Sequence, residues 1–215
     1  MGLYPVGFEL SGQDCVVVGG GEVAERKVEY LLQAGARVTV VSPEVTAGLR
    51  GMADEGILRW VAREYLDGDL RGFMLAMAAT DHEPVNRQVS AEARARKIPV
   101  NVCDVPELCS FIVPAVVHQG DLTVAIFTGG RSPTLARKIR EDLEQQFGPE
   151  YAEFLTILGA LRPQLMRDVP NLGLRQDVFR KLVYSNALDL LRQGRRDEVA
   201  AMAEAAIVAA RARSL

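Results

Sequence analysis

The sequence predicts an α/β fold: a Rossmann-like parallel sheet, then a hairpin-plus-helix segment and a small all-helical C-terminal domain. Two observations predict it. Short valine-rich runs alternate with amphipathic stretches up to about residue 103, which is typical of a parallel sheet covered by helices on both faces. From Tyr151 onward the chain has a helical pattern throughout. We therefore expect three parts, at residues 1–112, 113–148 and 149–215.

The first elements form a βαβ unit. Cys15–Val18 is a continuous apolar run bounded by glycine, as expected of a strand that is buried on both faces. Apolar residues then recur at helical spacing until Gly35, and glycine suits a helix C-terminus. Arg37–Val41 is the second strand. The length of this unit is that of a parallel strand–helix–strand crossover.

The alternation of strand and helix continues through the rest of the first part. The expected elements are a helix over Pro43–Glu55, strands over Ile57–Ala62 and Phe73–Ala78, a helix with Val85, Val89 and Ala93 on one face, and a strand over Val100–Val102. Thr80 and Glu83 have capping-box spacing at the start of the second of these helices. All five strands are therefore expected to run parallel in one sheet.

The pattern changes after the fifth strand. Two strands are expected around the turn at residues 119–121. A helix then begins with Ser132 as N-cap and Pro133 at the first helical position. Its apolar stripe consists of Leu135, Ile139, Leu143 and Phe147. Breaks near Asp168–Asn171 and Gly194 divide the remainder into about three helices.

Composition and charge exclude several classes of protein. The chain has 215 residues, a net charge of −3 and 48% apolar residues, so it has an ordinary globular composition without the basic balance typical of nucleic-acid binding. No stretch approaches the roughly 18 apolar residues of a membrane helix, and the N-terminus lacks the basic and apolar regions of a signal peptide. The chain has three cysteines, an odd number without the spacing of a disulfide framework, and this indicates a location in the reducing cytoplasm.

A glycine motif marks a candidate cofactor site. Gly19 and Gly21 belong to a G-x-G-x-x-A pattern between the first strand and its helix. Such glycines let the backbone approach a pyrophosphate at the positive helix N-terminus, although a tight turn without a ligand has the same pattern. The acidic residue expected about 20 positions further on is missing, and Ser42-Pro43-Glu44 follows the second strand instead. No arginine follows that strand to receive a 2′-phosphate, which favours NAD over NADP.

Polar residues follow the fourth and fifth predicted strands, at the same edge of the sheet. Thr80 could contact the cofactor or cap a helix. Asp104 could cap the turn at Pro106 or act as a catalytic acid/base beside the cofactor. Cys103 and Cys109 flank Asp104 but lack the second ligand pair of a zinc site, so we expect no metal there. The sequence has no Tyr-x-x-x-Lys signature, which leaves Asp104 as the best-placed titratable group, without a competing His or Tyr expected beside it.

A second glycine-containing loop, at residues 128–132, opens the helix of the second part. The helix N-terminus could receive an anion. Arg131, Arg137 and Lys138 cluster there and could bind carboxylates of a substrate. Acidic residues alternate with these basic ones, so a solvated helix face is an equally good interpretation.

Four stretches of the chain together resemble the precorrin-2 dehydrogenase / sirohydrochlorin ferrochelatase family. The chain resembles a stand-alone form of the N-terminal half of sirohaem synthase. The four stretches are VVVGGGEVAERKVEYLLQAGARVTVVSP, AATD followed by VN, NVCDVPELCSFIVPA and TGGRSPTLARKIRE. The resemblance extends over about residues 3–148. The combination of G-G-G-x-V-A-x-R-K with N-x-x-D-x-x-x-L-C-x-F-x-x-P-A is far more specific than either motif alone.

The resemblance implies roles for individual residues. The cofactor NAD would be held at its pyrophosphate by Gly19, Gly21, Glu22 and Val23 and flanked at its adenosine ribose by Ser42, Pro43 and Glu44. Asp104 would be the family's catalytic aspartate, which takes a proton while NAD accepts a hydride from the tetrapyrrole precorrin-2, a polycarboxylate. The resemblance also implies a homodimer formed through residues 113–148.

The product would be sirohydrochlorin, in sirohaem biosynthesis. The resemblance leaves open a second activity, the insertion of ferrous iron or cobalt into that product. Two other functions fit the predicted fold. One is a different NAD-dependent oxidoreductase, which would be expected to show its own acid/base signature. The other is a non-catalytic NAD-sensing regulatory module, for which the helical C-terminal domain would be the effector.

Overall fold

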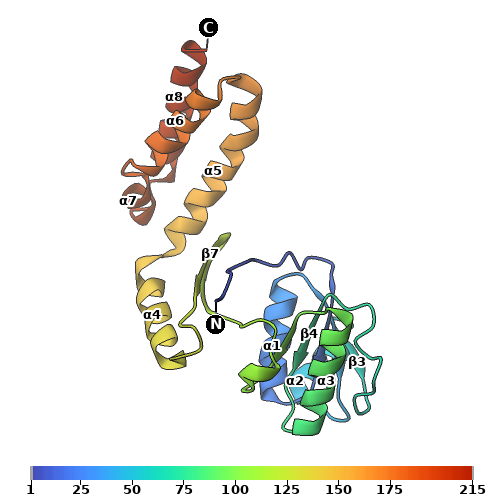
Figure 1. The fold of residues 1–215 in the computed structure, drawn as a ribbon. Helices are drawn as coiled ribbons and strands as arrows, with labels where there is room; N and C mark the ends of the chain where they lie inside the picture. The colour runs from blue at the N-terminus through green and yellow to red at the C-terminus, as the bar shows by residue number, and fades with distance from the viewer. Residues whose placement is uncertain (1, 215) are drawn as a thin grey trace. The chain divides into compact units, whose positions relative to one another are not determined.

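The computed structural model describes residues 2–214. They form two compact units, residues 2–113 and 114–214, and each contains a hydrophobic core of its own. Figure 1 follows the chain through the first unit, drawn in blue and green, and the second, drawn from yellow-green to red. The predicted further division of the second unit at residue 148 stays a prediction.

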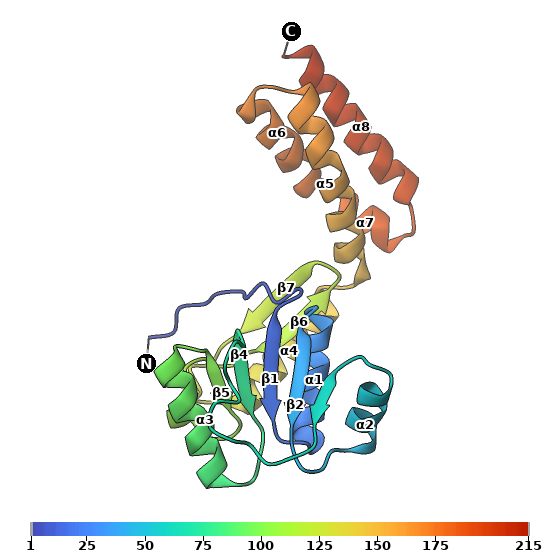
Figure 2. The same ribbon diagram turned by 90° about the vertical axis from the view of Figure 1, so that its right-hand side faces the viewer.

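The first unit contains a five-stranded parallel sheet with the strand order β3-β2-β1-β4-β5, which can be followed in Figure 2. The strands are β1 (Asp14–Val18), β2 (Arg37–Val41), β3 (Arg59–Val61), β4 (Leu75–Ala78) and β5 (Val100–Val102). The order changes direction at β1, because β2 and β3 lie on one side of it and β4 and β5 on the other. The predicted Rossmann-like sheet is confirmed.

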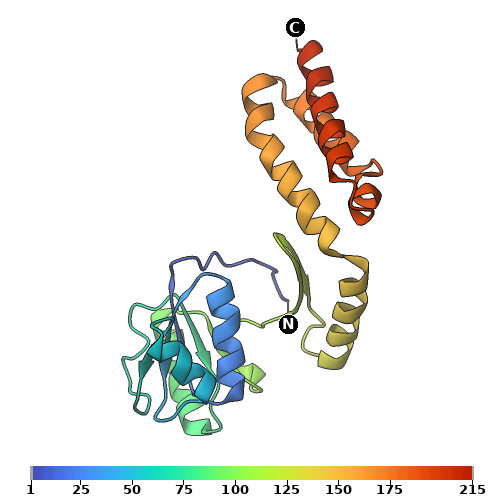
Figure 3. The same cartoon turned by 180° about the vertical axis from the view of Figure 1, so that it is seen from behind.

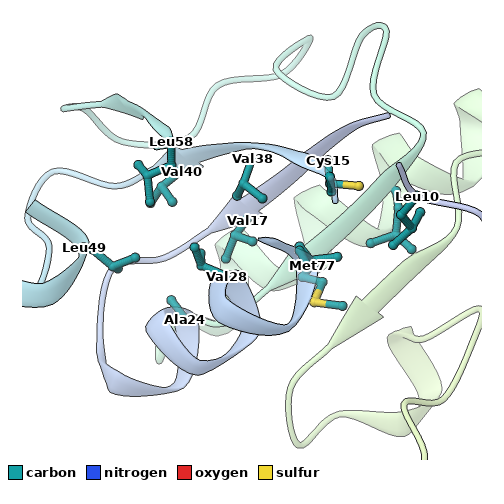
Figure 4. Close-up of a cluster of buried hydrophobic side chains, with 13 residues drawn as sticks. Leu10, Cys15, Val17, Ala24, Val28, Val38, Val40, Leu49, Leu58 and Met77 are labelled. Carbon is teal, nitrogen blue, oxygen red and sulfur yellow. The ribbon is translucent and has the colours of Figure 1, made fainter. Parts of the chain in front are cut away.

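Both faces of this sheet are covered. α1 (Glu22–Gln33) and α2 (Ala47–Asp54) pack on one face, and Figure 4 shows the apolar cluster that joins them to β1, β2 and β4. α3 (Glu83–Arg96) covers the other face together with residues 62–74, which connect β3 to β4. Because side chains alternate along a strand, both faces of β1 are apolar, as its continuous valine run indicated.

The helix expected over Pro43–Glu55 begins later than predicted. α2 starts at Ala47 because the Thr46 hydroxyl accepts a hydrogen bond from the Leu49 amide at 3.2 Å and so acts as the N-cap. Residues 42–45 form a loop at the carboxyl end of β2 instead. Proline suits a first helical position, so the local pattern alone did not distinguish Pro43 from Ala47 as the start.

The capping box predicted at the start of α3 does not form. His82 is the N-cap, and its side chain makes no capping hydrogen bond. The Thr80 hydroxyl instead accepts a hydrogen bond from the His82 amide at 3.0 Å, and the Asn86 side chain donates to the Thr80 carbonyl at 2.9 Å. Pro84 lies in the first turn of α3, where a missing N–H breaks no helical hydrogen bond, and this favours the later start.

The second unit begins with an antiparallel hairpin and a helix, as predicted. β6 (Ala115–Gln119) and β7 (Leu122–Ile126) pair around Gly120, whose φ of 57° suits glycine in a tight turn. α4 (Pro133–Gln146) starts after Ser132, whose hydroxyl accepts a hydrogen bond from a first-turn amide at 3.1 Å.

Four helices complete the described part of this unit, where about three were expected. They are α5 (Pro149–Asp168), α6 (Leu172–Val183), α7 (Ala187–Arg192) and α8 (Arg196–Ala212), which share one apolar core and are drawn in orange and red in Figure 3. The additional break comes at Ser185, whose hydroxyl donates to the Leu182 carbonyl at 2.7 Å and accepts from the Ala187 amide at 3.1 Å. Such local bonds compete with helix continuation. No helix among residues 2–214 combines the length and the apolar character that crossing a membrane requires.

Candidate functional site

A cleft of about 1030 Å³ lies at the carboxyl edge of the parallel sheet in the first unit. The edge belongs to a sheet whose strand order changes direction, and doubly wound sheets bind ligands at such a point. Loops after all five strands line the cleft: residues 19–23 after β1, 42–46 after β2, 64–65 after β3, 79–82 after β4 and 103–104 after β5. These loops contain every residue that the sequence indicated for the cofactor, together with Asp104.

The glycine turn between β1 and α1 is packed closely on one side and open on the other. Gly19 has a φ of 120°, and a Cβ atom on it would lie 2.3 Å from the Ala79 carbonyl oxygen. A Cβ on Gly20 would lie 2.0 Å from the Glu44 carbonyl oxygen. A Cβ on Gly21 would meet nothing within 4 Å, and no side chain caps α1 there. The first-turn amides at this positive helix end therefore fit a pyrophosphate.

Hydrogen bonds fix the loop after β2 to the glycine turn. The Thr46 amide donates to the Gly20 carbonyl at 2.9 Å, and the Thr46 hydroxyl donates to Glu25 of α1. Ser42 is buried, and its hydroxyl donates to the Glu44 carbonyl at 2.7 Å. Because the hydroxyl proton of Ser42 is already engaged, this residue can serve a ribose as a hydrogen-bond acceptor.

The described lining of the cleft is acidic. Its carboxylates belong to Glu22, Glu44, Glu64, Asp81 and Asp104, and it contains neither lysine nor arginine. A 2′-phosphate on an adenosine ribose would have no guanidinium or ammonium group to pair with in this lining. The charge distribution therefore agrees with the preference for NAD over NADP that the sequence indicated.

Asp104 follows β5 in a left-handed backbone conformation, with a φ of 61°. Few residues other than glycine adopt it, and aspartate is among those that tolerate it. The residue is exposed, and no hydrogen bond or ion pair within residues 2–214 engages its carboxylate. The short 3₁₀ helix η1 (Pro106–Leu108) has Val105 at its N-cap position and no side-chain capping bond. Asp104 is therefore not the cap of that turn, and its carboxylate lines the cleft unpaired.

The cysteine next to Asp104 is influenced by charges on both sides. Cys103 lines the cleft. Burial raises the pKa of its thiol, the positive charge of Lys27 opposes the shift, and the negative charge of Asp104 adds to it. Arg26 of the same helix, α1, acts on the Cys103 thiol in the same direction as Lys27. The sequence analysis missed both residues, although they belong to the motif G-G-G-x-V-A-x-R-K. Among residues 2–214 no three His, Cys, Asp or Glu side chains are placed to hold a metal ion together.

Two further residues of the site also escaped the sequence analysis. Tyr65, in the connection between β3 and β4, lines the cleft, and its hydroxyl donates to the buried carboxylate of Glu92 on α3. Glu92 also accepts hydrogen bonds from the amides of Gly68 at 2.9 Å and Leu70 at 3.3 Å and from Arg96 at 2.6 Å. Burial raises the pKa of Tyr65, so its hydroxyl remains a donor at neutral pH. No sequence pattern links Tyr65 to Glu92, because they meet only in the folded chain.

His82 lines the cleft as well. The expectation that neither His nor Tyr accompanies Asp104 is therefore wrong for the cleft, because residues remote in sequence converge at one sheet edge. The Tyr65 hydroxyl is engaged by Glu92, whereas His82 is exposed and its ring makes no hydrogen bond within residues 2–214. His82 is thus a second candidate for proton transfer.

The basic residues predicted to bind substrate lie on or just before α4 in the second unit. Arg137 pairs with Glu141 at 2.8 Å, and Lys138 pairs with Asp142, in both cases one turn along the same helix. This is the solvated helix face that the sequence analysis kept as an alternative, and exposed pairs of this kind contribute little stability. Arg131 precedes the helix and is exposed. A role of these basic residues toward substrate stays a prediction.

Comparison with known families gives three consecutive matches along the chain. Residues 6–115 match a family described as putative NAD(P)-binding. Residues 119–146 match the central region of sirohaem biosynthesis proteins, and residues 150–207 match the sirohaem synthase dimerisation region. The chain belongs to the sirohaem biosynthesis family of NAD(P)-binding proteins. The match to the dimerisation region covers the helices after α4. The sequence analysis expected the dimer contact in residues 113–148, and that expectation stays a prediction.

Curated proteins similar to this chain include siroheme synthases. That of Pseudomonas aeruginosa (strain LESB58) is 40% identical over 204 residues, which are 95% of this chain and 44% of that protein. That of Methylobacillus flagellatus is 46% identical over 162 residues, which are 75% of this chain and 35% of that protein. The chain thus spans less than half the length of these relatives. Among solved structures, SirC, a precorrin-2 dehydrogenase, is similar with a TM-score of 0.77 and 28% identity, over 94% of this chain and 99% of that one.

Proposed function

We propose that this protein oxidises precorrin-2 to sirohydrochlorin with NAD as the hydride acceptor. The observation that carries the proposal is the combination of a glycine-turn cleft with an unpaired carboxylate, Asp104, at the same sheet edge. The similarity to SirC over nearly the full length of both chains supports this reaction. Membership of the sirohaem biosynthesis family supports it as well.

NAD fits the cleft at the glycine turn. The residues proposed to contact it are Gly19, Gly21, Glu22, Val23, Ser42, Pro43, Glu44 and Thr80. The first-turn amides of α1 would donate to the pyrophosphate, which the open side of Gly21 lets approach. Ser42 would accept a hydrogen bond from a ribose hydroxyl. When bound, NAD supplies the hydride acceptor of the reaction.

Asp104 is proposed to move the proton of the reaction. Oxidation of precorrin-2 removes a hydride and a proton from the ring, and the unpaired carboxylate of Asp104 can accept that proton without first breaking another hydrogen bond. Lys27 and Arg26 of α1 are proposed to favour the approach of an anionic substrate, since their positive charges act on the Cys103 thiol beside Asp104.

The charge of the substrate requires more cations than the cleft offers. Precorrin-2 is a polycarboxylate, and the acidic lining of the cleft would repel it. Besides Lys27, we propose that Arg131, Arg137 and Lys138 of the second unit bind substrate carboxylates. For Arg137 and Lys138 this means exchanging their ion pairs along α4, which are exposed and therefore weak.

Two extensions belong to the same proposal. The protein is proposed to act as a homodimer, for which the match of residues 150–207 to a dimerisation region is the support. It is also proposed to insert ferrous iron or cobalt into sirohydrochlorin. Two pyrrole protons must leave the ring as the metal enters, and Asp104 is the carboxylate proposed to accept them one at a time, releasing the first to water before it takes the second.

Incubation of the protein with NAD and precorrin-2 tests the proposed reaction. We expect the absorption spectrum of sirohydrochlorin to appear together with that of NADH. Addition of ferrous iron or cobalt to sirohydrochlorin, in a separate reaction, tests the insertion of the metal. A protein that binds NAD and leaves precorrin-2 unchanged would instead be an NAD-sensing module or an oxidoreductase for another substrate.

A further inference from the structure

We infer that Cys109 is a positioning residue for Asp104, because its side chain clamps the turn that presents the carboxylate to the cleft. The inference rests on the proposed function, in which Asp104 transfers the proton. Cys109 is not part of the cleft lining. It would therefore act through the geometry of Asp104 and not through contact with substrate or cofactor.

The sulfur of Cys109 bridges the two ends of the turn. It accepts a hydrogen bond from the Val102 amide at 3.2 Å, and it lies 3.2 Å from the Val102 carbonyl oxygen and 3.4 Å from the Val105 carbonyl oxygen. The single S–H proton can serve either carbonyl. Val102 ends β5 and Val105 directly follows Asp104. The backbone bond that closes the turn, from the Val105 amide to the Val102 carbonyl, is long at 3.4 Å, so the sulfur reinforces the turn where backbone pairing is weak.

Cys109 and Ser110 provide hydrogen-bond partners that a neighbouring strand would otherwise provide to β5. β5 is an edge strand, so the outward backbone groups of Val100 and Val102 face no further strand. Ser110 serves Val100, because its amide donates to the Val100 carbonyl at 2.8 Å and its hydroxyl accepts from the Val100 amide at 2.8 Å. Cys109 serves Val102 with its side chain. Because Val102 is buried, loss of the sulfur would leave its amide without a partner and away from water.

The segment that carries Cys109 is anchored to α3, which gives the clamp a fixed base. The buried Ser90 hydroxyl donates to the Leu108 carbonyl at 2.7 Å. The Arg94 guanidinium donates to the Glu107 carbonyl at 2.7 Å. A fixed base matters because a left-handed backbone is uncommon for a residue other than glycine, and such conformations persist where the surrounding structure holds them.

Cys109→Ala removes the clamp and leaves Asp104 in place. We expect kcat for precorrin-2 oxidation to fall roughly 10- to 100-fold, because a displacement of about 1 Å at a reacting group can cost that much. NAD affinity, measured by calorimetry, should stay at the wild-type value because the glycine turn is untouched. Cys109→Ser should recover most of the lost rate, since a hydroxyl can also accept from the Val102 amide and donate to a carbonyl.

Cys15→Ala is the matched control. It removes a fully buried thiol from β1 of the same sheet, and Cys15 is not part of the cleft lining. We expect this variant to lower the melting temperature without lowering kcat. Wild-type turnover in a folded Cys109→Ala protein would overturn the inference. An equal loss of kcat in Cys15→Ala would overturn it too, because stability alone would then govern the rate.

A crystal structure of Cys109→Ala separates this inference from the proposed function. The φ of Asp104 is expected to leave the left-handed region whatever reaction the protein catalyses, and an unchanged φ would contradict the clamp. If the wild-type protein does not oxidise precorrin-2, the proposed function fails and this backbone measurement still decides the role of Cys109. Cys109→Val, which fills the space without a hydrogen bond, takes the place of Cys109→Ala if the latter does not fold.

Discussion

At the residue scale, the carboxylate of Asp104 combines two properties that an acid/base needs: it lines the cleft, and nothing within residues 2–214 pairs with it. Asparagine tolerates the left-handed backbone as aspartate does, so Asp104→Asn removes the basic oxygen and keeps the turn. We expect precorrin-2 oxidation to fall by roughly 10²–10⁴, the usual contribution of a positioned acid/base. Melting temperature and NAD affinity should stay near the wild-type values, and the spectrum of the tetrapyrrole measures turnover.

Asp121→Asn is the control for this substitution. Asp121 is an exposed aspartate in the β6–β7 turn, so the variant loses the same charge outside the cleft lining and should keep full activity. A folded Asp104→Asn protein with wild-type turnover would refute the catalytic role. His82→Ala would then test the second candidate for proton transfer.

A substitution of Gly21 tests, also at the residue scale, whether the pyrophosphate of NAD binds at the glycine turn. A side chain there meets nothing within 4 Å in the protein, so Gly21→Asp should fold and place a carboxylate where the pyrophosphate approaches. Two like charges about 4 Å apart repel by about 4 kcal/mol at an effective dielectric constant of about 20. We therefore expect NAD affinity, measured by calorimetry, to fall at least about 100-fold.

Gly51→Asp provides the comparison for that measurement. Gly51 lies in α2, outside the cleft lining, and a Cβ on it also meets nothing within 4 Å. It should bind NAD as the wild type does. Equal NAD affinities of the two folded variants would rule out a pyrophosphate at the glycine turn.

At the scale of elements, one buried carboxylate ties α3 to the connection between β3 and β4. Burial acts to raise the pKa of Glu92, but hydrogen bonds from Tyr65, the Gly68 amide and Arg96 outweigh it, so the pKa lies below its ordinary value of 4.5. A lowered folded pKa means that the ionised form stabilises the fold. This contribution is fully present above the unfolded pKa and is lost as the pH falls through the folded pKa.

Glu92→Gln should therefore destabilise the protein in a pH-dependent way. We expect the free energy of unfolding to fall by about 1–3 kcal/mol at neutral pH, because the buried donors lose their charged acceptor. The difference from wild type should shrink as the pH falls below about 4.5. Urea denaturation at neutral and acidic pH measures both effects.

Glu83→Gln on the same helix is the control for this effect. Glu83 forms an exposed ion pair with Arg87, and such pairs are worth about 0–1 kcal/mol. Its stability should stay close to that of the wild type at both pH values. A Glu92→Gln deficit that grows in acid would contradict the assigned direction of the Glu92 pKa.

At the scale of the whole molecule, the match of residues 150–207 to a dimerisation region predicts a second copy of the chain as partner. Leu135 of α4 is 52% exposed, and Leu172 at the start of α6 is 61% exposed. We expect a dimer by sedimentation equilibrium at micromolar concentration, and weakening of that dimer by Leu172→Glu, which lies in the match to the dimerisation region. A wild-type mass of one chain would contradict this expectation.

Two further variants locate the dimer contact. A larger effect of Leu135→Glu than of Leu172→Glu would favour the segment 113–148, as the sequence analysis predicted. Ile57→Glu changes a residue of the first unit that is 50% exposed. It should leave the dimer intact and so control for the added charge.

The sequence by itself determined the parallel sheet, the glycine turn and the place of Asp104. Valine runs and helical spacing record burial within short segments, and these local patterns gave the order of strands and helices. The carboxyl ends of parallel strands meet at one edge of a sheet. The sequence alone therefore predicts that Gly19, Ser42, Thr80 and Asp104 meet at one site.

Only the tertiary structure decided the limits of some helices and the contacts that support that site. The later start of α2 and the break at Ser185 were not predictable, because competing local caps of similar strength exist in the sequence. The bond of Tyr65 to Glu92 spans 27 positions, and the bond of Cys109 to Val102 depends on the chain folding back along an open strand edge. Periodicity describes which face of a segment is buried, whereas the partner of a buried polar group is selected by packing in three dimensions.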